Sequence, residues 1–228
     1  MAKDIKLNKA SMKWESKVKH VGNIINCSLK DEDDICYKKQ CFFIQVNKLL
    51  ANYQGVKCNI LSQLFSKYCS SFYGSQLWDL RSKDINSLYK SWNRAVRRVF
   101  TLPYNSHCYF LPLLLQVPSL EVQLCQRFIK FCRKMYYNRN EVVSYMCRNG
   151  LKRSTSILSR NLYIICKRFN CNVTQLLQGY TVKHSFSHDE IATCEHLREL
   201  LYARDRVVTV EGFSSLELQV MINAISTL

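Results

Sequence analysis

The sequence predicts a mainly α-helical protein with a small β-hairpin near its N-terminus. Apolar residues recur at spacings of three, four and seven from Ile35 onward, which is the period of an amphipathic helix. Only the stretch from Trp14 to Asn26 alternates loosely and contains a glycine, as a short strand pair does. The chain has 228 residues, of which 47% are hydrophobic and 22% charged. It therefore has enough apolar material for one large domain or two small ones.

Two helices are expected directly after the hairpin. Four acids, Asp31 to Asp34, supply the negative charge that favours a first helical turn, and apolar positions continue to Tyr53. Gly55 interrupts the pattern. A second helix is predicted over 60–73, and its aromatic residues lead us to expect that it is buried. Gly74 is expected to bend this helix or to let another backbone come close.

A third helix is predicted from about Ser82 to Phe100, and Pro103 ends it because proline disfavours helical backbone in the residue before it. Ser119 is expected to cap the next helix, which the pattern predicts over 122–140. No internal repeat or low-complexity linker occurs. Later helices are predicted over 140–148, 154–169, 172–178, 187–204 and 212–228.

The positive charge of the chain is concentrated in its middle. The formal net charge is +16, and residues 85–188 hold sixteen Lys and Arg against two acids, Glu121 and Glu141, a balance of +14. The rest holds seventeen Lys and Arg against fifteen acids, a balance of +2. A field of one sign this large attracts polyanions. Nucleic acid is the partner we expect first. An anionic membrane surface and a merely solvated surface are the alternatives.

Two predicted helices carry the basic residues that we expect to contact phosphates. Those of the helix over 82–100 lie off its apolar stripe, and the helix that follows has no acid between Val122 and Asn140. Contacts of this kind position a nucleic acid without reading its sequence. The candidate nucleic-acid-binding residues are Lys90, Arg94, Arg97, Arg98, Arg127, Lys130, Arg133 and Lys134.

The sequence gives no sign of a membrane protein or a secreted one. No apolar run approaches the roughly 20 residues of a membrane helix, and "MAKDIKLNK" is not followed by the apolar core of a secretory signal. We therefore expect an intracellular protein, nuclear or cytoplasmic, without a membrane partner. The twelve cysteines are not paired at short spacings, and most lie in apolar periodic segments. Free buried thiols are the expectation.

Two patterns suggest a metal site, and neither is expected to be one. Paired aspartates can hold divalent ions, but "DEDD" at 31–34 opens an amphipathic helix. Cys166, Cys171, His184 and His188 fit the spacing C-x4-C-x12-H-x3-H of a zinc finger. The positions where such a finger has its aromatic residue and its leucine hold glutamine and threonine. No metal ligand is therefore assigned.

No pattern of catalytic residues stands out either. The sequence contains no G-x-S-x-G motif and no phosphate-binding glycine-rich loop, and it has only six glycines. His107 follows a helix-ending proline, where a lone histidine is expected to form a structural hydrogen bond. We expect no catalytic residue and no cofactor in this chain.

A series of segments follows an order that is typical of one protein family. The segments are "KVKHVGNIIN", "DEDDICYK", "FFIQVNKLLANYQGVKCNILSQLFSKYCSSFYGSQLWDL", "SWNRAVRRVFTLPYNSH", "LPLL", "RFIKFCRKM", "LRELLYARD" and "GFSSLELQVMINAI". They resemble the C-terminal part of a LINE-type (non-LTR) retrotransposon reverse transcriptase. The resemblance runs from about Lys17 to the end of the chain. It is most specific where Phe72–Trp78, Trp92–Pro103 and His107 occur together.

The resemblance implies a function for each part. Residues 1–30 would be the remnant of the palm edge with its primer-grip hairpin, 31–118 a thumb-like helical bundle, and 119–228 a helical C-terminal region. The implied partner is a template–primer duplex of RNA and DNA, held through its phosphates. "KHVGN" resembles the family's His/Tyr-Leu-Gly-Asn segment, with valine in place of the usual leucine. The residues that would hold the primer end are Lys19, His20, Gly22 and Asn23.

The sequence departs from the family at its chemistry. The family's catalytic hairpin, Ala-Asp-Asp after an aromatic residue, should precede "KHVGN" and does not occur here. The Mg²⁺ ions would belong to that missing palm, so we expect a fragment or degraded copy that is inactive alone. Three hypotheses remain: a binding module, a part of an RNA-directed DNA polymerase that needs a palm from a longer product, and a helical interaction or relic protein without a nucleic-acid role.

Overall fold

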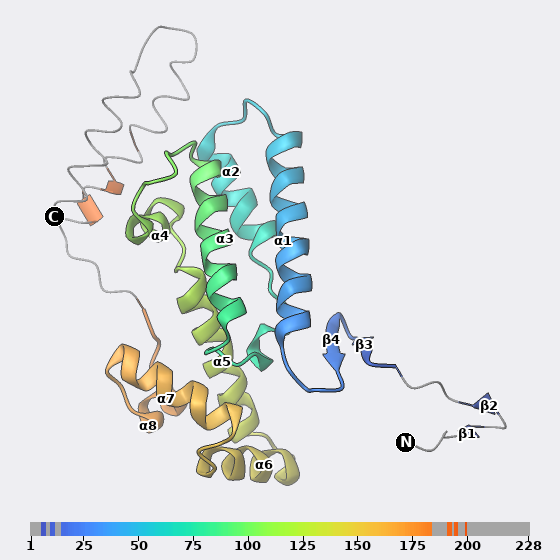
Figure 1. Cartoon of the computed structure of the whole chain (residues 1–228). Coiled ribbons are helices and arrows are strands. Elements are labelled where there is room, and N and C mark those ends of the chain that lie inside the picture. The colour runs from blue at the N-terminus through green and yellow to red at the C-terminus, as the bar shows by residue number, and fades with distance from the viewer. Residues whose placement is uncertain are drawn as a thin grey trace, which may run out of the picture.

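The computed structural model is mainly helical with a small N-terminal β-hairpin, as the sequence predicts (Figure 1). It describes residues 6–7, 10–11, 15–183, 191–192, 194–195 and 199. The strands pair as two antiparallel hairpins, β1 with β2 and β3 with β4. The strands are β1 Lys6–Leu7, β2 Ala10–Ser11, β3 Lys17–His20 and β4 Asn23–Asn26. The α-helices are α1 Glu32–Asn52, α2 Cys58–Leu64, α3 Lys83–Val99, α4 Leu111–Leu115, α5 Leu120–Tyr136, α6 Glu141–Lys152, α7 Ile157–Phe169 and α8 Val173–Gln178.

A first core lies between α1, α2 and α3, which stand side by side in Figure 1. The helical period places apolar residues of all three toward each other, and aromatic rings fill the centre. The Phe42 ring lies 6.1 Å from the Phe65 ring and 5.6 Å from the Phe72 ring, between centroids. The Phe65 and Trp92 rings lie 6.2 Å apart. The predicted helices over 31–53 and 82–100 are confirmed as α1 and α3.

The second predicted helix, over 60–73, is wrong in its length and partly in its burial. The α-helix ends at Leu64, and a single π-helical turn follows over Phe65–Cys69. Both ends of this segment, Phe65 and Cys69, are buried in the first core. Beyond it the chain is irregular, and Tyr68 and Tyr73 are exposed by 64% and 58%. Aromatic content alone did not distinguish the buried rings from the exposed ones.

A short helix that the sequence did not reveal completes the first core. A 3₁₀ turn over Cys108–Phe110 precedes α4, and Pro112 occupies the first turn of α4, where proline is tolerated. Leu111, Leu114 and Leu115 are buried. The run "LPLLL" carries too few residues for a helical period to be visible.

A second core lies between α5, α7 and α8, and α5 belongs to both cores. Leu120 and Leu124 of α5 pack in the first core, whereas Phe128 and Cys132 pack in the second. The Ser119 hydroxyl accepts the Val122 N–H at 3.3 Å, so the predicted cap is confirmed. α5 ends at Tyr136, before the predicted end. The boundary between 118 and 119 stays a prediction.

The later helices follow the predicted order. The helices predicted over 140–148, 154–169 and 172–178 are confirmed as α6, α7 and α8. The helix predicted over 187–204 falls largely outside the described residues, and the one over 212–228 falls wholly outside them.

The twelve cysteines are thiols and not disulfides, as expected. Half of them are buried, and burial raises the pKa of the Cys69 thiol to about 11 and of the Cys125 and Cys132 thiols to about 12. These thiols stay protonated near neutral pH and act as small apolar packing residues. Three others, Cys27, Cys36 and Cys108, are exposed.

No single helix in the described ranges is both long and apolar enough to cross a membrane. Two segments, Cys108–Leu115 and Leu120–Tyr136, have the length and apolar composition of a membrane-spanning helix only when they are taken together. A bend of 67° separates them.

Candidate nucleic-acid interface

The α3 helix separates an apolar face from a basic one. The Ser82 hydroxyl caps it by accepting the Asp84 N–H at 3.2 Å. The negative Asp84 lies in the first turn, and the positive Arg97 and Arg98 lie in the last turn. Each charge is opposite in sign to the helix dipole at that end and is therefore favourable. The buried face consists of Ile85, Leu88, Ser91, Trp92, Ala95, Val96 and Val99.

Lys90, Arg94 and Arg98 form the exposed basic line of α3, at intervals of four residues. One Arg98 N–H donates to Asn47 Oδ1 of α1 at 2.8 Å. The Arg94 guanidinium carbon lies 5.6 Å from the Tyr104 ring centroid, a cation–π contact. Neither contact neutralises a charge, and none of the ion pairs in the described part of the chain involves these three residues.

Arg97, the fourth candidate on α3, serves the fold. Its side chain is half-buried, and its Nε and terminal N–H groups donate to the Ser106 carbonyl at 3.0 and 2.7 Å. The loop after α3 folds back over this guanidinium. Arg97 lies off the buried face of α3, as its position in the helical pattern predicted. The loop carbonyl that it meets was not visible in the sequence.

As on α3, some of the four candidates on α5 are exposed and others bind backbone carbonyls. Lys130 and Lys134 are exposed, one turn apart, and form no ion pair among the described residues. Arg127 is half-buried and donates to the Ser70 and Phe72 carbonyls at 2.8 and 2.9 Å. These bonds hold α5 against the irregular segment that follows the π turn. Burial lowers the Arg127 pKa without removing its charge.

Arg133 holds the far end of the second core in a similar way. Its guanidinium donates to the carbonyls of Leu176 and Tyr180, at the end of α8. Five of the eight candidate side chains are therefore exposed to solvent, and three arginines bind backbone carbonyls. A guanidinium fork suits such carbonyl clusters, whereas a lysine ammonium on its flexible stem stays in water.

The predicted hairpin around Lys19–Asn23 is confirmed as β3–β4. His20 pairs with Asn23, so Val21 and Gly22 form a two-residue turn. Both have positive φ, +46° and +78°, as a type I′ turn requires, and this backbone is uncommon for a β-branched valine. Lys19 and His20 are exposed, whereas Gly22 and Asn23 are half-buried. Their role toward a primer stays a prediction.

The β3–β4 hairpin lies beside the start of α1 (Figure 1), and hydrogen bonds join the two elements. Lys38 donates to the Gly22 carbonyl at 2.6 Å, and Lys19 donates to the Tyr37 hydroxyl at 2.8 Å. The Asn23 side chain lies against Gly74, where an added Cβ would come within 1.9 Å of Asn23 Oδ1. Gly74 has φ +84° and allows a close approach, as predicted, although the neighbour is a side chain and not a backbone.

The acids at 31–34 open α1, as predicted, and they also join three segments of the chain. No side chain caps the helix. The buried Asp34 carboxylate accepts the Ile24 N–H at 2.9 Å and the Trp78 indole N–H at 2.8 Å. Asp31 accepts the Asp79 N–H at 2.7 Å. Asp33 binds Asn26 and Lys17, and these bonds lower its pKa.

The segment around Trp78 also connects the two cores. Asn161 of α7 is fully buried, accepts the Leu80 N–H at 3.0 Å and donates to the Trp78 carbonyl at 2.8 Å. Arg160 pairs with Asp79 at 2.9 Å. Sequence reasoning missed these residues, because a polar residue on a helix gives no sign of a partner some eighty positions away.

The zinc-finger spacing falls partly outside the described residues, since His184 and His188 are not among them. Cys166 is half-buried at the end of α7, and the Cys171 N–H donates to its carbonyl at 3.1 Å. Among the described residues no group of three His, Cys, Asp or Glu side chains could hold a metal ion.

His107 forms the local hydrogen bond that was expected of it. Its Nδ1 accepts the Tyr109 N–H at 3.3 Å and caps the 3₁₀ turn before α4. It lines a pocket of about 320 Å³ with Trp92 and with the ion pair of Glu121 and Arg168. The charges of Glu121 and Arg168 are matched by each other, so neither is an unpaired charge in this pocket.

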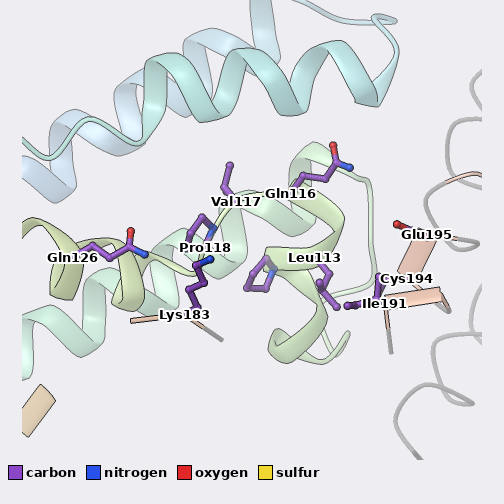
Figure 2. Close-up of a pocket in the computed structure, with 10 residues that line it drawn as sticks. Leu113, Gln116, Val117, Pro118, Gln126, Lys183, Ile191, Cys194 and Glu195 are labelled. Carbon is purple, nitrogen blue, oxygen red and sulfur yellow. The ribbon is translucent and has the colours of Figure 1, made fainter. Parts of the chain in front are cut away.

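A second pocket of about 380 Å³ lies beside α4 (Figure 2). Pro112, Leu113, Val117 and Pro118 give it an apolar wall. Leu113 lies opposite Ile191 and Cys194, which belong to the C-terminal part of the chain. None of the eight basic candidates lines this pocket. It is therefore separate from the basic surfaces of α3 and α5.

No protein-family model, no curated protein and no solved structure matches this chain.

Proposed function

We propose that the chain is a non-catalytic nucleic-acid-binding module that holds a template–primer duplex through its phosphates. One observation carries the proposal: Lys90, Arg94 and Arg98 stand in a line on the outer face of α3, exposed and without an acidic partner in the described residues. A row of unpaired cations on one helix face suits the regularly spaced charges of a nucleic-acid backbone.

The charge around this row supports the same partner. Residues 35–120 contain eleven Lys and Arg and two acids, Asp79 and Asp84. Asp79 pairs with Arg81 and Arg160, and Asp84 bonds to Ser82 at the start of α3. Little negative charge is therefore left to repel phosphates near the middle and the end of α3.

The sequence resemblance supplies the identity of the proposed duplex. The segments over 72–78 and 92–103 resemble the thumb of a LINE-type reverse transcriptase, which packs on the template–primer duplex. On this proposal the chain is a part of such an enzyme that retains binding. Lys130 and Lys134 on α5 add two exposed charges to the binding surface. Arg97, Arg127 and Arg133 support the fold, because their N–H groups already bind carbonyls.

A salt titration tests the proposed interface. The variant Lys90→Gln/Arg94→Gln/Arg98→Gln is expected to bind unrelated duplexes more weakly, and about equally so for each. The slope of log affinity against log salt should become shallower by roughly 2.7, since each lost phosphate contact removes about 0.9 for a B-form duplex. Fluorescence anisotropy at salt concentrations between about 50 and 200 mM measures it.

The matched control is Lys30→Gln/Lys57→Gln/Lys67→Gln, which removes the same charge from exposed positions elsewhere. It should leave the slope close to that of the parent chain. If the two triple variants lose affinity equally and show the same decrease in the salt slope, binding depends only on net charge. The α3 face is then not the interface. Arg97 is left unchanged because its loss would free the loop after α3.

The same chain is expected to lack polymerase activity. Phosphoryl transfer requires carboxylates that hold two metal ions, and the acids at 31–34 bind the hairpin and the Trp78 segment instead. A primed template with Mg²⁺ or Mn²⁺ should therefore show no primer extension. Extension that disappears with Asp33→Asn/Asp34→Asn, while the circular dichroism spectrum stays native, would contradict this.

A further inference from the structure

The corner between α5 and α6 exposes an apolar and aromatic surface that no other described segment covers. Tyr137, Val142, Tyr145 and Met146 form this surface, which we term the α5–α6 corner, and their exposed fractions are 62%, 65%, 67% and 65%. The three residues on α6 are spaced by three and four positions, so they share one helix face. Figure 1 shows α6 at the outer end of the molecule, beside α5 and α7.

The exposed face of α6 is fixed by its buried face. The Asn140 side chain caps the helix by accepting the Val142 N–H at 3.0 Å. Ser144 and Cys147 are buried, and the Ser144 hydroxyl donates to the Tyr136 carbonyl at 3.0 Å. Because this face packs on α5, the opposite face with Tyr145 points away from the protein.

The buried and the exposed aromatic residues of the described part of the chain differ in type. Every described phenylalanine and tryptophan is buried or half-buried. Among the described tyrosines nine are exposed: Tyr53, Tyr68, Tyr73, Tyr104, Tyr109, Tyr137, Tyr145, Tyr163 and Tyr180. A tyrosine tolerates water through its hydroxyl and still offers a flat ring for stacking.

Positive charge surrounds the corner. Glu141 is the one acid between residues 122 and 183. The exposed basic residues nearest in sequence to the corner are Lys134, Arg139, Arg148, Lys152 and Arg153. The Arg148 guanidinium carbon lies 5.2 Å from the Tyr136 ring centroid, and the Tyr136 and Tyr137 rings are 5.0 Å apart. The Arg148 cation, the Tyr136 ring and the exposed Tyr137 ring are therefore consecutive neighbours at the corner.

We propose that the α5–α6 corner binds an unpaired strand of nucleic acid, with bases stacked on Tyr137 and Tyr145 and phosphates on the surrounding arginines and lysines. A polyanion with flat apolar faces matches both properties of the surface, whereas a phosphate-only contact would leave the rings unused. The inference goes beyond duplex binding by α3, since it concerns another surface and another form of nucleic acid.

The test compares two strands of equal length, an oligothymidine and an abasic strand that keeps every phosphate. The variant Tyr137→Ala/Tyr145→Ala is expected to bind oligothymidine about tenfold or more weakly, because each stacked base contributes measurably to affinity. Its binding to the abasic strand and to a duplex should stay at the parental level. Tyr137→Phe/Tyr145→Phe should restore oligothymidine binding, since phenylalanine keeps the ring.

A second measurement uses the unsubstituted chain. Photocrosslinking to a strand that carries 5-iodouracil should place the crosslinks on Tyr137 or Tyr145. The proposal is overturned if crosslinks map elsewhere, if the alanine variant binds oligothymidine as the parent does, or if it loses the abasic strand equally. It is also overturned if the alanine variant loses binding to anionic phospholipid vesicles and keeps oligothymidine binding. The α3 triple variant separates the two proposals, because it should weaken duplex binding and retain the tenfold effect of the tyrosines.

Discussion

Replacing Asp34 by alanine is expected to lower the free energy of unfolding by about 3 kcal/mol, a large part of the stability of a domain of this size. The carboxylate is buried and accepts the Ile24 N–H and the Trp78 indole N–H. Without it, the buried Trp78 indole N–H and the half-buried Ile24 N–H lose their acceptor, and an unsatisfied buried donor costs about 1–3 kcal/mol. Urea unfolding followed by circular dichroism measures the change.

A double-mutant cycle identifies the bond that is lost. Trp78→Phe removes the indole N–H, so Asp34→Ala should cost less in the Trp78→Phe background than in the parent chain. Asp33→Asn is the control and should matter far less, because the lost ion pair is with the exposed Lys17 and the asparagine oxygen can still accept the Asn26 N–H. Equal costs of Asp34→Ala in both backgrounds would show that the indole bond contributes nothing to stability.

Gly74→Ala is expected to destabilise the protein by about 2–3 kcal/mol. A left-handed backbone with φ +84° costs alanine about 1 kcal/mol relative to glycine. The added Cβ would also lie 1.9 Å from Asn23 Oδ1, so the β3–β4 hairpin or the Asn23 side chain must move. Thermal or urea unfolding reports the difference.

Gly55→Ala is the matched control for this prediction. Gly55 has φ +75°, and a Cβ there would meet no atom within 4 Å, so only the backbone term of about 1 kcal/mol applies. Asn23→Ala should bring the cost of Gly74→Ala down to that of Gly55→Ala, because it removes the obstructing amide. If Gly74→Ala and Gly55→Ala cost the same in the parent chain, the approach of Asn23 to Gly74 is not tight.

The predictable parts of the fold are those that are encoded locally. α1, α3, α5 and the β3–β4 hairpin were predicted because their period, caps and turn residues lie within one segment. The π turn at Phe65–Cys69 and the short α4 were not, because packing in the first core determines them.

The candidate site also combines features that are encoded locally with features that depend on other segments of the chain. The outward direction of Lys90, Arg94 and Arg98 follows from helix geometry, and the sequence predicted it. The half-buried state of Arg97 and Arg127 depends on carbonyls of irregular segments, at Ser106 and at Ser70 and Phe72. Such acceptors leave no periodic signal, so a basic residue that stabilises the fold looks like one that binds a phosphate.

The membership of α5 in both cores leads us to expect cooperative unfolding. A cut before Leu120 would leave α5 with the second core and remove Leu120 and Leu124 from the first. A cut after α5 would strip Phe128 and Cys132 from the second core. Melting of one half alone would expose apolar surface of the other, so we expect the described part of the chain to unfold as one cooperative unit.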